Sequence, residues 1–214
     1  KLINQFNQMP FLKEFIINHN TKIKLWKLSL GELDYYELDE YDTKLINSKK
    51  NKLNKEQFLA VRKTLKLENP SYKIRYDESG KPSINSDLNI SISHSNHMAA
   101  IVFSGYSRAG IDIELKESKI LKIKDKFLNE SEKLKNEFQS DLDYLTMIWT
   151  AKESIYKALG IKGVSFSDDI IIKNISNNKG EGYYARGNEK YKFDLFYFII
   201  DDYILCYAQS NNLS

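Results

Sequence analysis

The alternation of hydrophobic and polar positions in the first half of the chain predicts strands separated by two helices. Residues 22–30 alternate with a period of two, which is typical of a half-buried strand. Residues 55–67 carry apolar side chains at helical spacing, and Pro70 ends the pattern. Similar patterns predict a helix at 42–52 and strands at 72–76, 90–93, 98–104 and 108–115. We expect the last two strands to form a hairpin around the turn at 105–107.

In the second half, two helices precede a run of strands. Helices are predicted at 120–138 and 142–159, and Gly160 provides a C-terminal cap for the second. Strands are predicted at 169–173, 182–186, 191–200 and 203–209, with a hairpin turn between the last two. Because both halves contain strands with helices between them, the pattern indicates an α+β fold.

Composition narrows the class of protein. The 214 residues are 42% hydrophobic and 13% aromatic, which supports a packed core. A net charge of +3 is too small to favour nucleic acid as the main partner. The first 105 residues carry 16 basic against 12 acidic side chains, a lean that would suit an anionic ligand.

Cysteine usage and hydropathy bear on the compartment. The single cysteine, Cys206, cannot form a disulfide within the chain, and this fits a reducing cytosol. No apolar run reaches the roughly 18 residues that a membrane-spanning helix needs. We therefore expect a cytoplasmic protein with no membrane partner. A chain of this length could function as a monomer.

Two acidic residues stand out in the strand predicted at 108–115. Asp112 and Glu114 are two positions apart and point to the same face of a strand, while Ile111 and Ile113 point to the other. Adjacent carboxylates repel unless a positive group lies between them, and Mg²⁺ favours oxygen ligands. The pair is therefore either a candidate metal site or an exposed strand face with two solvated acids.

The helix predicted at 142–159 carries a second candidate group. Glu153 and Lys157 are four residues apart and share a helix face, and Trp149 lies one turn earlier. By itself this spacing also fits an ordinary surface salt bridge.

Two further segments could bind phosphate. Ser93 and His94 lie at the end of a predicted strand and either donate hydrogen bonds to a phosphate or have a structural role. Lys81 and Pro82 follow a turn at Gly80, which by itself indicates little. The chain contains no Walker loop, no Gly-x-Gly-x-x-Gly motif, no His-Glu-x-x-His motif and no cysteine pair for zinc. From the residues alone, the chain reads as an α+β protein with a possible Mg²⁺ site and candidate phosphate ligands.

Taken in order, these segments resemble one family. Gly-Lys-Pro at 80–82, Ile-Ser-His-Ser at 92–95, Gly-Ile-Asp-Ile-Glu at 110–114 and Trp-x-x-Lys-Glu-Ser-x-x-Lys at 149–157 are similar to the motifs of the Sfp-type 4'-phosphopantetheinyl transferases. The resemblance covers residues 80–160 well. It implies two similar α+β halves related by a pseudo-two-fold axis, residues 1–105 and 106–214, with the active site at their interface.

The resemblance also implies a reaction and roles for residues. The enzyme would transfer the 4'-phosphopantetheine arm of coenzyme A to a serine of an acyl or peptidyl carrier protein, with Mg²⁺ as cofactor and 3',5'-ADP as leaving group. The implied metal ligands are Asp112, Glu114 and Glu153. Glu153 is also the family's proposed general base, and Lys157 would act on the phosphates. The implied coenzyme A contacts are Lys81, Pro82, Ser93, His94 and Lys157.

Other implications remain broader. Phe127 and Leu128 are candidate carrier contacts, although both could equally be core residues. The 3'-phosphate would be held by the lysine-rich first half (Lys44, Lys49, Lys50, Lys52 and Lys55), and Arg62 is either a further contact or structural. Carriers of fatty-acid, polyketide and nonribosomal-peptide synthesis all fit. The alternatives are another Mg²⁺-dependent phosphotransferase or a non-catalytic protein that binds coenzyme A or a carrier.

Overall fold

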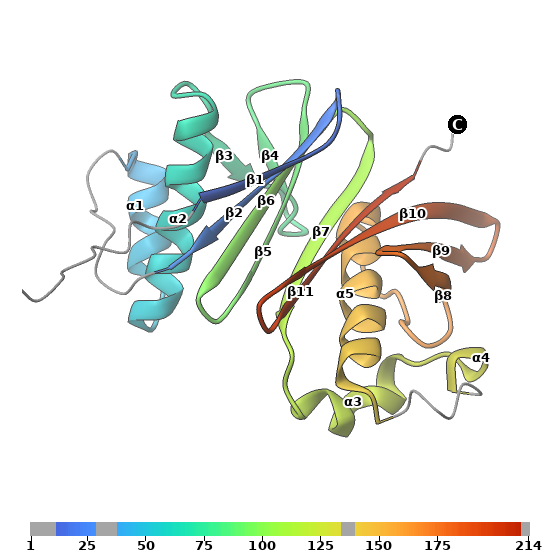
Figure 1. Ribbon diagram of the computed structural model, residues 1–214. Helices are drawn as coiled ribbons and strands as arrows, with labels where there is room; N and C mark the ends of the chain where they lie inside the picture. The colour runs from blue at the N-terminus through green and yellow to red at the C-terminus, as the bar shows by residue number, and fades with distance from the viewer. Residues whose placement is uncertain (1–11, 29–37, 134–139, 211–214) are drawn as a thin grey trace, which may run out of the picture.

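The computed structural model describes residues 12–28, 38–133 and 140–210, and these form two antiparallel sheets with helices (Figure 1). The first sheet uses strands from residues 12–104, and the second uses strands from residues 108–210. A separate two-stranded ribbon, β3 and β4, lies beside the first sheet. The α+β class expected from the sequence is confirmed.

The first sheet has the strand order β1-β2-β6-β5. The strands of this sheet are β1 Leu12–Asn18, β2 Thr21–Lys27, β5 Asn89–Ser95 and β6 Met98–Ser104. The strands of the ribbon are β3 Ile74–Tyr76 and β4 Pro82–Ile84. The second sheet has the order β7-β11-β10-β9-β8. Its bounds are β7 Arg108–Leu115, β8 Ile170–Ser176, β9 Lys179–Arg186, β10 Glu189–Ile200 and β11 Tyr203–Ser210.

The helices begin and end where the sequence provides caps. Their bounds are α1 Glu40–Asn47, α2 Lys52–Glu68, α3 Lys119–Phe127, α4 Glu130–Lys133 and α5 Leu142–Leu159. The side chains of Asp39, Asn51 and Asp141 accept hydrogen bonds from the first turns of α1, α2 and α5. Gly160 ends α5 in the left-handed conformation, with φ of 65°, as the sequence predicts. No helix in the described ranges is long and apolar enough to cross a membrane.

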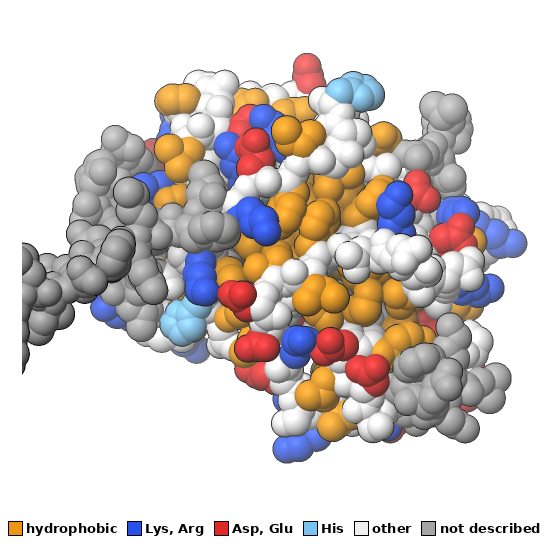
Figure 2. Space-filling view, viewed as in Figure 1, with side chains coloured by type: hydrophobic (Ala, Val, Ile, Leu, Met, Phe, Trp, Pro, Cys, Tyr) orange, Lys and Arg blue, Asp and Glu red, His pale blue; other side chains and the backbone are white. Residues whose placement is uncertain are grey.

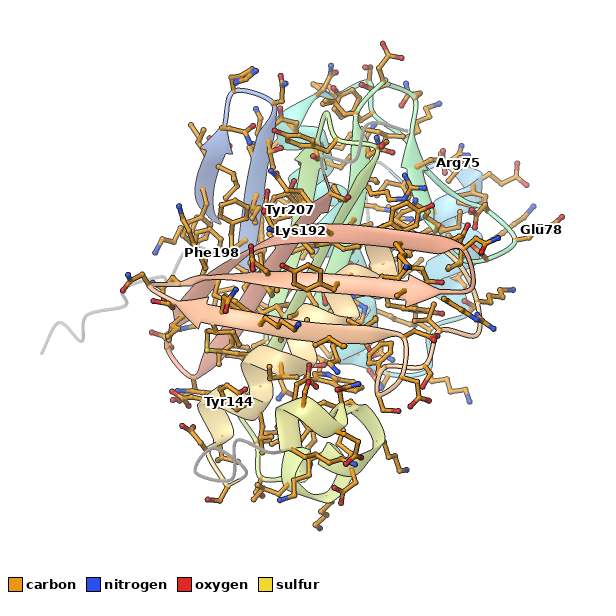
Figure 3. All side chains as sticks on the ribbon, turned by 90° about the vertical axis from the view of Figure 1, so that its right-hand side faces the viewer. Arg75, Glu78, Tyr144, Lys192, Phe198 and Tyr207 are labelled. Atoms are coloured by element: carbon orange, nitrogen blue, oxygen red, sulfur yellow. The ribbon has the colours of Figure 1, made fainter. Side chains whose placement is uncertain are left out.

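Three buried clusters hold these elements together. One packs α1 and α2 on the first sheet, and another packs α3 and α5 on the second. The third joins the two sheets, because Ile23, Leu25 and Val102 of the first sheet pack with Ile111 and Leu205 of the second. Figure 2 shows hydrophobic side chains gathered over the middle of this face, where strands of both sheets approach each other. Figure 3 looks onto the second sheet, with α5 behind it and α3 and α4 below.

The predicted hairpin of residues 98–104 and 108–115 is wrong. Both edges of β6 are occupied, by β2 and β5, so β7 pairs with β11 instead. The turn at 105–107 therefore carries the chain from one sheet to the other. By contrast, the predicted hairpin between β10 and β11 is confirmed, with Asp201 at φ of 52° in its turn.

The single helix predicted at 120–138 is broken. The helix α3 ends at Phe127, because Leu128 is extended and both side chains turn into the core. Asn129 then accepts a hydrogen bond from the Ser131 N–H and starts α4. Residues 134–139 lie outside the described part of the chain. The strands β1 and β4 were not predicted.

Candidate active site

The strand β7 places the two predicted acids side by side at the seam between the sheets. Ile111 and Ile113 are fully buried on one face of the strand, and Asp112 and Glu114 alternate with them. Asp112 is only 3% exposed, whereas Glu114 is half-buried. The alternation predicted from the sequence is therefore present, but Asp112 is not solvated.

The helix α5 brings the second candidate group to the same strand. It packs closely against β7 at Gly110, where a Cβ atom would lie 2.0 Å from the Ser154 carbonyl oxygen and 2.7 Å from the Ala158 nitrogen. The absent side chain of Gly110 thus permits the contact. Between the helix α5 and the strand β7, the Lys157 Nζ donates a hydrogen bond to Asp112 Oδ1 at 2.7 Å.

Each acid of β7 is held by two side-chain donors. Asp112 Oδ1 accepts from the Ser93 hydroxyl at 2.7 Å as well as from Lys157. Glu114 Oε2 accepts from the Ser95 hydroxyl at 2.9 Å, and Glu114 Oε1 accepts from Trp149 Nε1 at 3.3 Å. Asp112 Oδ2 is buried and has no hydrogen-bond partner among the described residues.

The pKa of Glu153 is strongly raised at this site. Burial, followed by the charge of Asp112, raises the pKa of the Glu153 carboxyl to about 7, although Lys157 acts in the opposite direction. Burial and the nearby Asp112 also raise the pKa of Glu114. The negative charges of both Asp112 and Glu114 therefore act on Glu153. Carboxyls whose charges act on one another in this way favour a bound cation.

The residues present fit a hard divalent cation. Three carboxylates offer oxygen donors of the kind that Mg²⁺ prefers, and the buried Asp112 Oδ2 lacks a partner that a cation would supply. Among the described residues, the acids do not stand as a ready cluster of three metal ligands, and Lys157 is bonded to Asp112. A cation would take over part of the charge compensation that Lys157 now gives.

A cavity of about 340 Å³ is lined by Lys157, which connects it to Asp112, although none of the three acids is among its lining residues. Four lysines and a histidine give it a cationic wall: Lys49, Lys81, Lys157, Lys162 and His94. Tyr76, Pro82 and Tyr156 contribute flatter surfaces. Partial desolvation and the charge of Lys157 lower the pKa of His94. The cavity suits an elongated anionic ligand with an aromatic part.

The structure brings together most of the residues singled out in the sequence for binding coenzyme A. Lys81, Pro82, His94 and Lys157 line the cavity. Ser93 does not line it, since it is buried and directed at Asp112.

The lysine-rich region contributes one side chain to the cavity wall, Lys49, whereas Lys44 pairs with the exposed Glu40. Arg62 is buried and forms an ion pair with Asp42 at 2.8 Å, with its guanidinium over the Phe58 ring. Among the described residues, its role is therefore to hold α1 against α2.

Sequence reasoning missed several residues of the wall. Tyr156 and Lys162 flank the end of α5, and Tyr76 follows the buried Ile74 in β3. Tyr156 directly precedes Lys157, so its place in the motif was a usable signal. The ribbon formed by β3 and β4 supplies Tyr76, and in Figure 3 its connecting turn carries Glu78 out to the edge of the molecule.

The lysine inside the helix motif has a different task from Lys157. Lys152 is fully buried, and its Nζ donates to Glu132 and to three backbone carbonyls, those of Phe127, Phe166 and Ile170, at 2.7–2.9 Å. Burial lowers its pKa, and Glu132 counters this effect. Lys152 thus joins α5 to the chain segments beneath it.

The candidate carrier contacts Phe127 and Leu128 need correction. They are 0% and 2% exposed and belong to the core under α5. Their side chains therefore cannot contact a docked carrier on this surface. The break of α3 is what turns them inward.

Two comparisons with known proteins bear on this site. The sequence model of the family described as the 4'-phosphopantetheinyl transferase superfamily matches residues 108–208. A protein described as 4'-phosphopantetheinyl transferase gsp, from Aneurinibacillus migulanus, is 34% identical to the chain over 99 residues. That match covers 45% of this chain and 41% of the relative, so the chain spans less than half of the relative's length.

The family match includes both acids of β7 as well as Glu153 and Lys157. It begins at the first residue of β7 and takes in α5, the elements whose close packing forms the acidic site. Residues 108–208 of this chain are therefore similar to the 4'-phosphopantetheinyl transferase superfamily.

Proposed function

We propose that the protein is a 4'-phosphopantetheinyl transferase that modifies a carrier-protein serine with the arm of coenzyme A, using Mg²⁺. The observation that carries the proposal is the position of Lys157, which lines the cationic cavity and also bonds Asp112. One side chain thus connects a site for a polyanion with a group of three carboxyls. In this proposal the chain divides near Gly105, and the site lies where the halves 1–105 and 106–214 meet.

The cavity would hold coenzyme A through its phosphates. Lys157, which bonds Asp112, and His94 would contact the pyrophosphate, while Lys49, Lys81 and Lys162 would hold further phosphate charge. Tyr76 and Pro82 would border the adenine. A Mg²⁺ ion on Asp112, Glu114 and Glu153 would supply charge stabilisation to the phosphate oxygens.

The transfer would be a displacement at phosphorus. The serine oxygen of the carrier forms a bond to the β-phosphorus of coenzyme A, and the bond to 3',5'-ADP breaks. Lys157 would stabilise the charge that develops on the phosphate oxygens. The serine proton needs an acceptor, and Glu153, with its pKa near 7, is our candidate for it. Cation binding would lower the basicity of Glu153, so its role as a ligand comes first.

The test is transfer to carriers of known class. The purified chain is incubated with coenzyme A, Mg²⁺ and a panel of apo acyl and peptidyl carriers, and each carrier is weighed by mass spectrometry. We expect at least one carrier to gain the mass of one phosphopantetheine, with 3',5'-ADP released in equal amount. A folded chain that modifies no carrier in the panel would contradict the proposal. Coenzyme A binding without transfer would indicate a binding protein.

A matched pair of variants connects the activity to the site. Glu153→Gln removes a charge from the group of three carboxyls and should abolish transfer while the fold is retained, as judged by circular dichroism. Glu130→Gln removes a charge from an exposed glutamate of α4, whose side chain is 86% exposed, and should leave transfer unchanged. Equal activity of the two variants would rule out the role given to Glu153.

A further inference from the structure

The strands β5 and β7 meet at the seam without a backbone ladder between them. β5 pairs with β6, and β7 pairs with β11, so the facing N–H groups of β7 need other acceptors. Serine hydroxyls of β5 provide them at a constant offset of 20 residues. The bonds run from Ile111 N–H to Ser91 at 3.1 Å, from Ile113 N–H to Ser93 at 3.3 Å and from Leu115 N–H to Ser95 at 3.2 Å.

The same hydroxyls meet the two acids. A serine hydroxyl has one hydrogen to donate and two lone pairs to accept. Ser93 accepts from β7 and donates to Asp112, and Ser95 accepts from β7 and donates to Glu114. Each hydroxyl therefore fixes a carboxylate relative to the backbone of the strand that carries it.

The first serine of the series lacks this second contact. By the same register, Ser91 would donate to the side chain at position 110, which is glycine. Ser91 therefore accepts a hydrogen bond from the backbone of β7 but does not donate one to an acid of that strand. The chain thus contains, in one strand, two serines that hold acids and one that makes the same backbone contact alone.

We propose that Ser93 and Ser95 are positioning residues that orient Asp112 and Glu114 toward a divalent cation; the inference rests on the proposed metal site. The Ser93 bond, together with Lys157, engages Asp112 Oδ1 and leaves the buried Oδ2 without a partner. Ser95 and Trp149 engage one oxygen each of Glu114. These bonds restrict the rotation of both carboxylates.

The experiment measures metal binding directly. Mn²⁺ is titrated into the purified full chain without coenzyme A or carrier, and free Mn²⁺ is counted by electron paramagnetic resonance. Ser93→Ala and Ser95→Ala are compared with Ser91→Ala, which loses the same kind of backbone contact. Because coenzyme A is absent, the place of Ser91 in the cavity wall does not affect the readout.

We expect Ser93→Ala and Ser95→Ala to weaken Mn²⁺ binding by about 10-fold or more, as loss of an outer partner of a metal ligand typically does. Ser91→Ala should bind Mn²⁺ nearly as the wild type does. Ser95→Thr, which keeps the hydroxyl, should restore binding. Ser95→Cys keeps the size of the side chain but donates poorly, so it should behave like Ser95→Ala even if the alanine variant folds badly.

Two results would overturn the inference, and they differ. If Ser93→Ala and Ser95→Ala bind Mn²⁺ with the same affinity as Ser91→Ala, the serines only hold the two strands together. Absence of Mn²⁺ binding by the wild-type chain would instead refute the metal site of the proposed function, and this inference with it.

Discussion

Glu153 shows how neighbouring charges set the chemistry of a single side chain. It lies half-buried on α5, and burial together with Asp112 and Glu114 raises the pKa of its carboxyl to about 7. A carboxyl whose pKa is higher in the folded than in the unfolded chain binds extra protons on folding. For Glu153 this difference spans the range from its ordinary value of 4.5 to about 7.

The metal-free protein should therefore lose stability as the pH rises through this range. The contribution of Glu153 is fully present below about pH 4.5 and is lost above about pH 7, an effect of roughly 2.5 kcal/mol between pH 5 and pH 8. The free energy of unfolding in urea, measured for the wild type and for Glu153→Gln at pH 5 and at pH 8, isolates the contribution of Glu153. The variant should show the smaller decline, and added Mg²⁺ should flatten the wild-type curve. Parallel pH profiles of the two proteins would contradict this account.

The contact of α5 with β7 is the main constraint at the scale of elements. It brings Lys157 to Asp112 and places Glu153 within the influence of the strand acids' charges, and it depends on the missing side chain at Gly110. At that position a Cβ atom would meet backbone of α5 instead of a flexible side chain, so one of the two elements must move.

Gly110→Ala should consequently lower the free energy of unfolding by about 2 kcal/mol or more. It should also weaken Mn²⁺ binding, because the displaced helix carries Glu153. Gly105→Ala is the control, since its Cβ atom would come no closer than 3.3 Å to the Asn20 side chain. Thermal unfolding and Mn²⁺ titration of both variants test the prediction, and a Gly110→Ala protein as stable as the control would refute it.

At the scale of the whole molecule, the two sheets share a core. The third hydrophobic cluster draws on both of them, and a chain of hydroxyls joins them as well. Ser104 lies between Thr21, at 3.1 Å, and Tyr207, at 3.2 Å, and all three hydroxyls are buried. Such a shared core favours unfolding of both sheets together.

The two tryptophans allow this cooperativity to be measured. Trp26 packs in the core of the first sheet, and Trp149 lies on α5 against the second. In Trp26→Phe and in Trp149→Phe, the remaining tryptophan reports on one sheet, while far-ultraviolet circular dichroism reports on both. We expect fluorescence and circular dichroism to give one midpoint within each variant. Separate midpoints would show that the sheets unfold independently.

Much of the local structure could be predicted from the sequence. The period of two put Asp112 and Glu114 on one face of β7, and Gly160 marked the end of α5. The order of the short motifs pointed to the superfamily whose sequence model matches residues 108–208. These features depend on residues near one another in the chain, so their spacing is enough to predict them.

The partners of each element were decided by tertiary structure. The sequence placed β7 next to β6, but β6 has both edges filled, and β7 pairs with a strand almost a hundred residues later. The direction of the Ser93 hydroxyl, the burial of Lys152 and the inward turn of Phe127 follow from such long-range packing. The sequence by itself determined which faces of the strands and helices carry the acids and Lys157. Only the folded chain decided which faces meet, because a strand edge or a buried hydroxyl takes its partner from whatever segment packs against it.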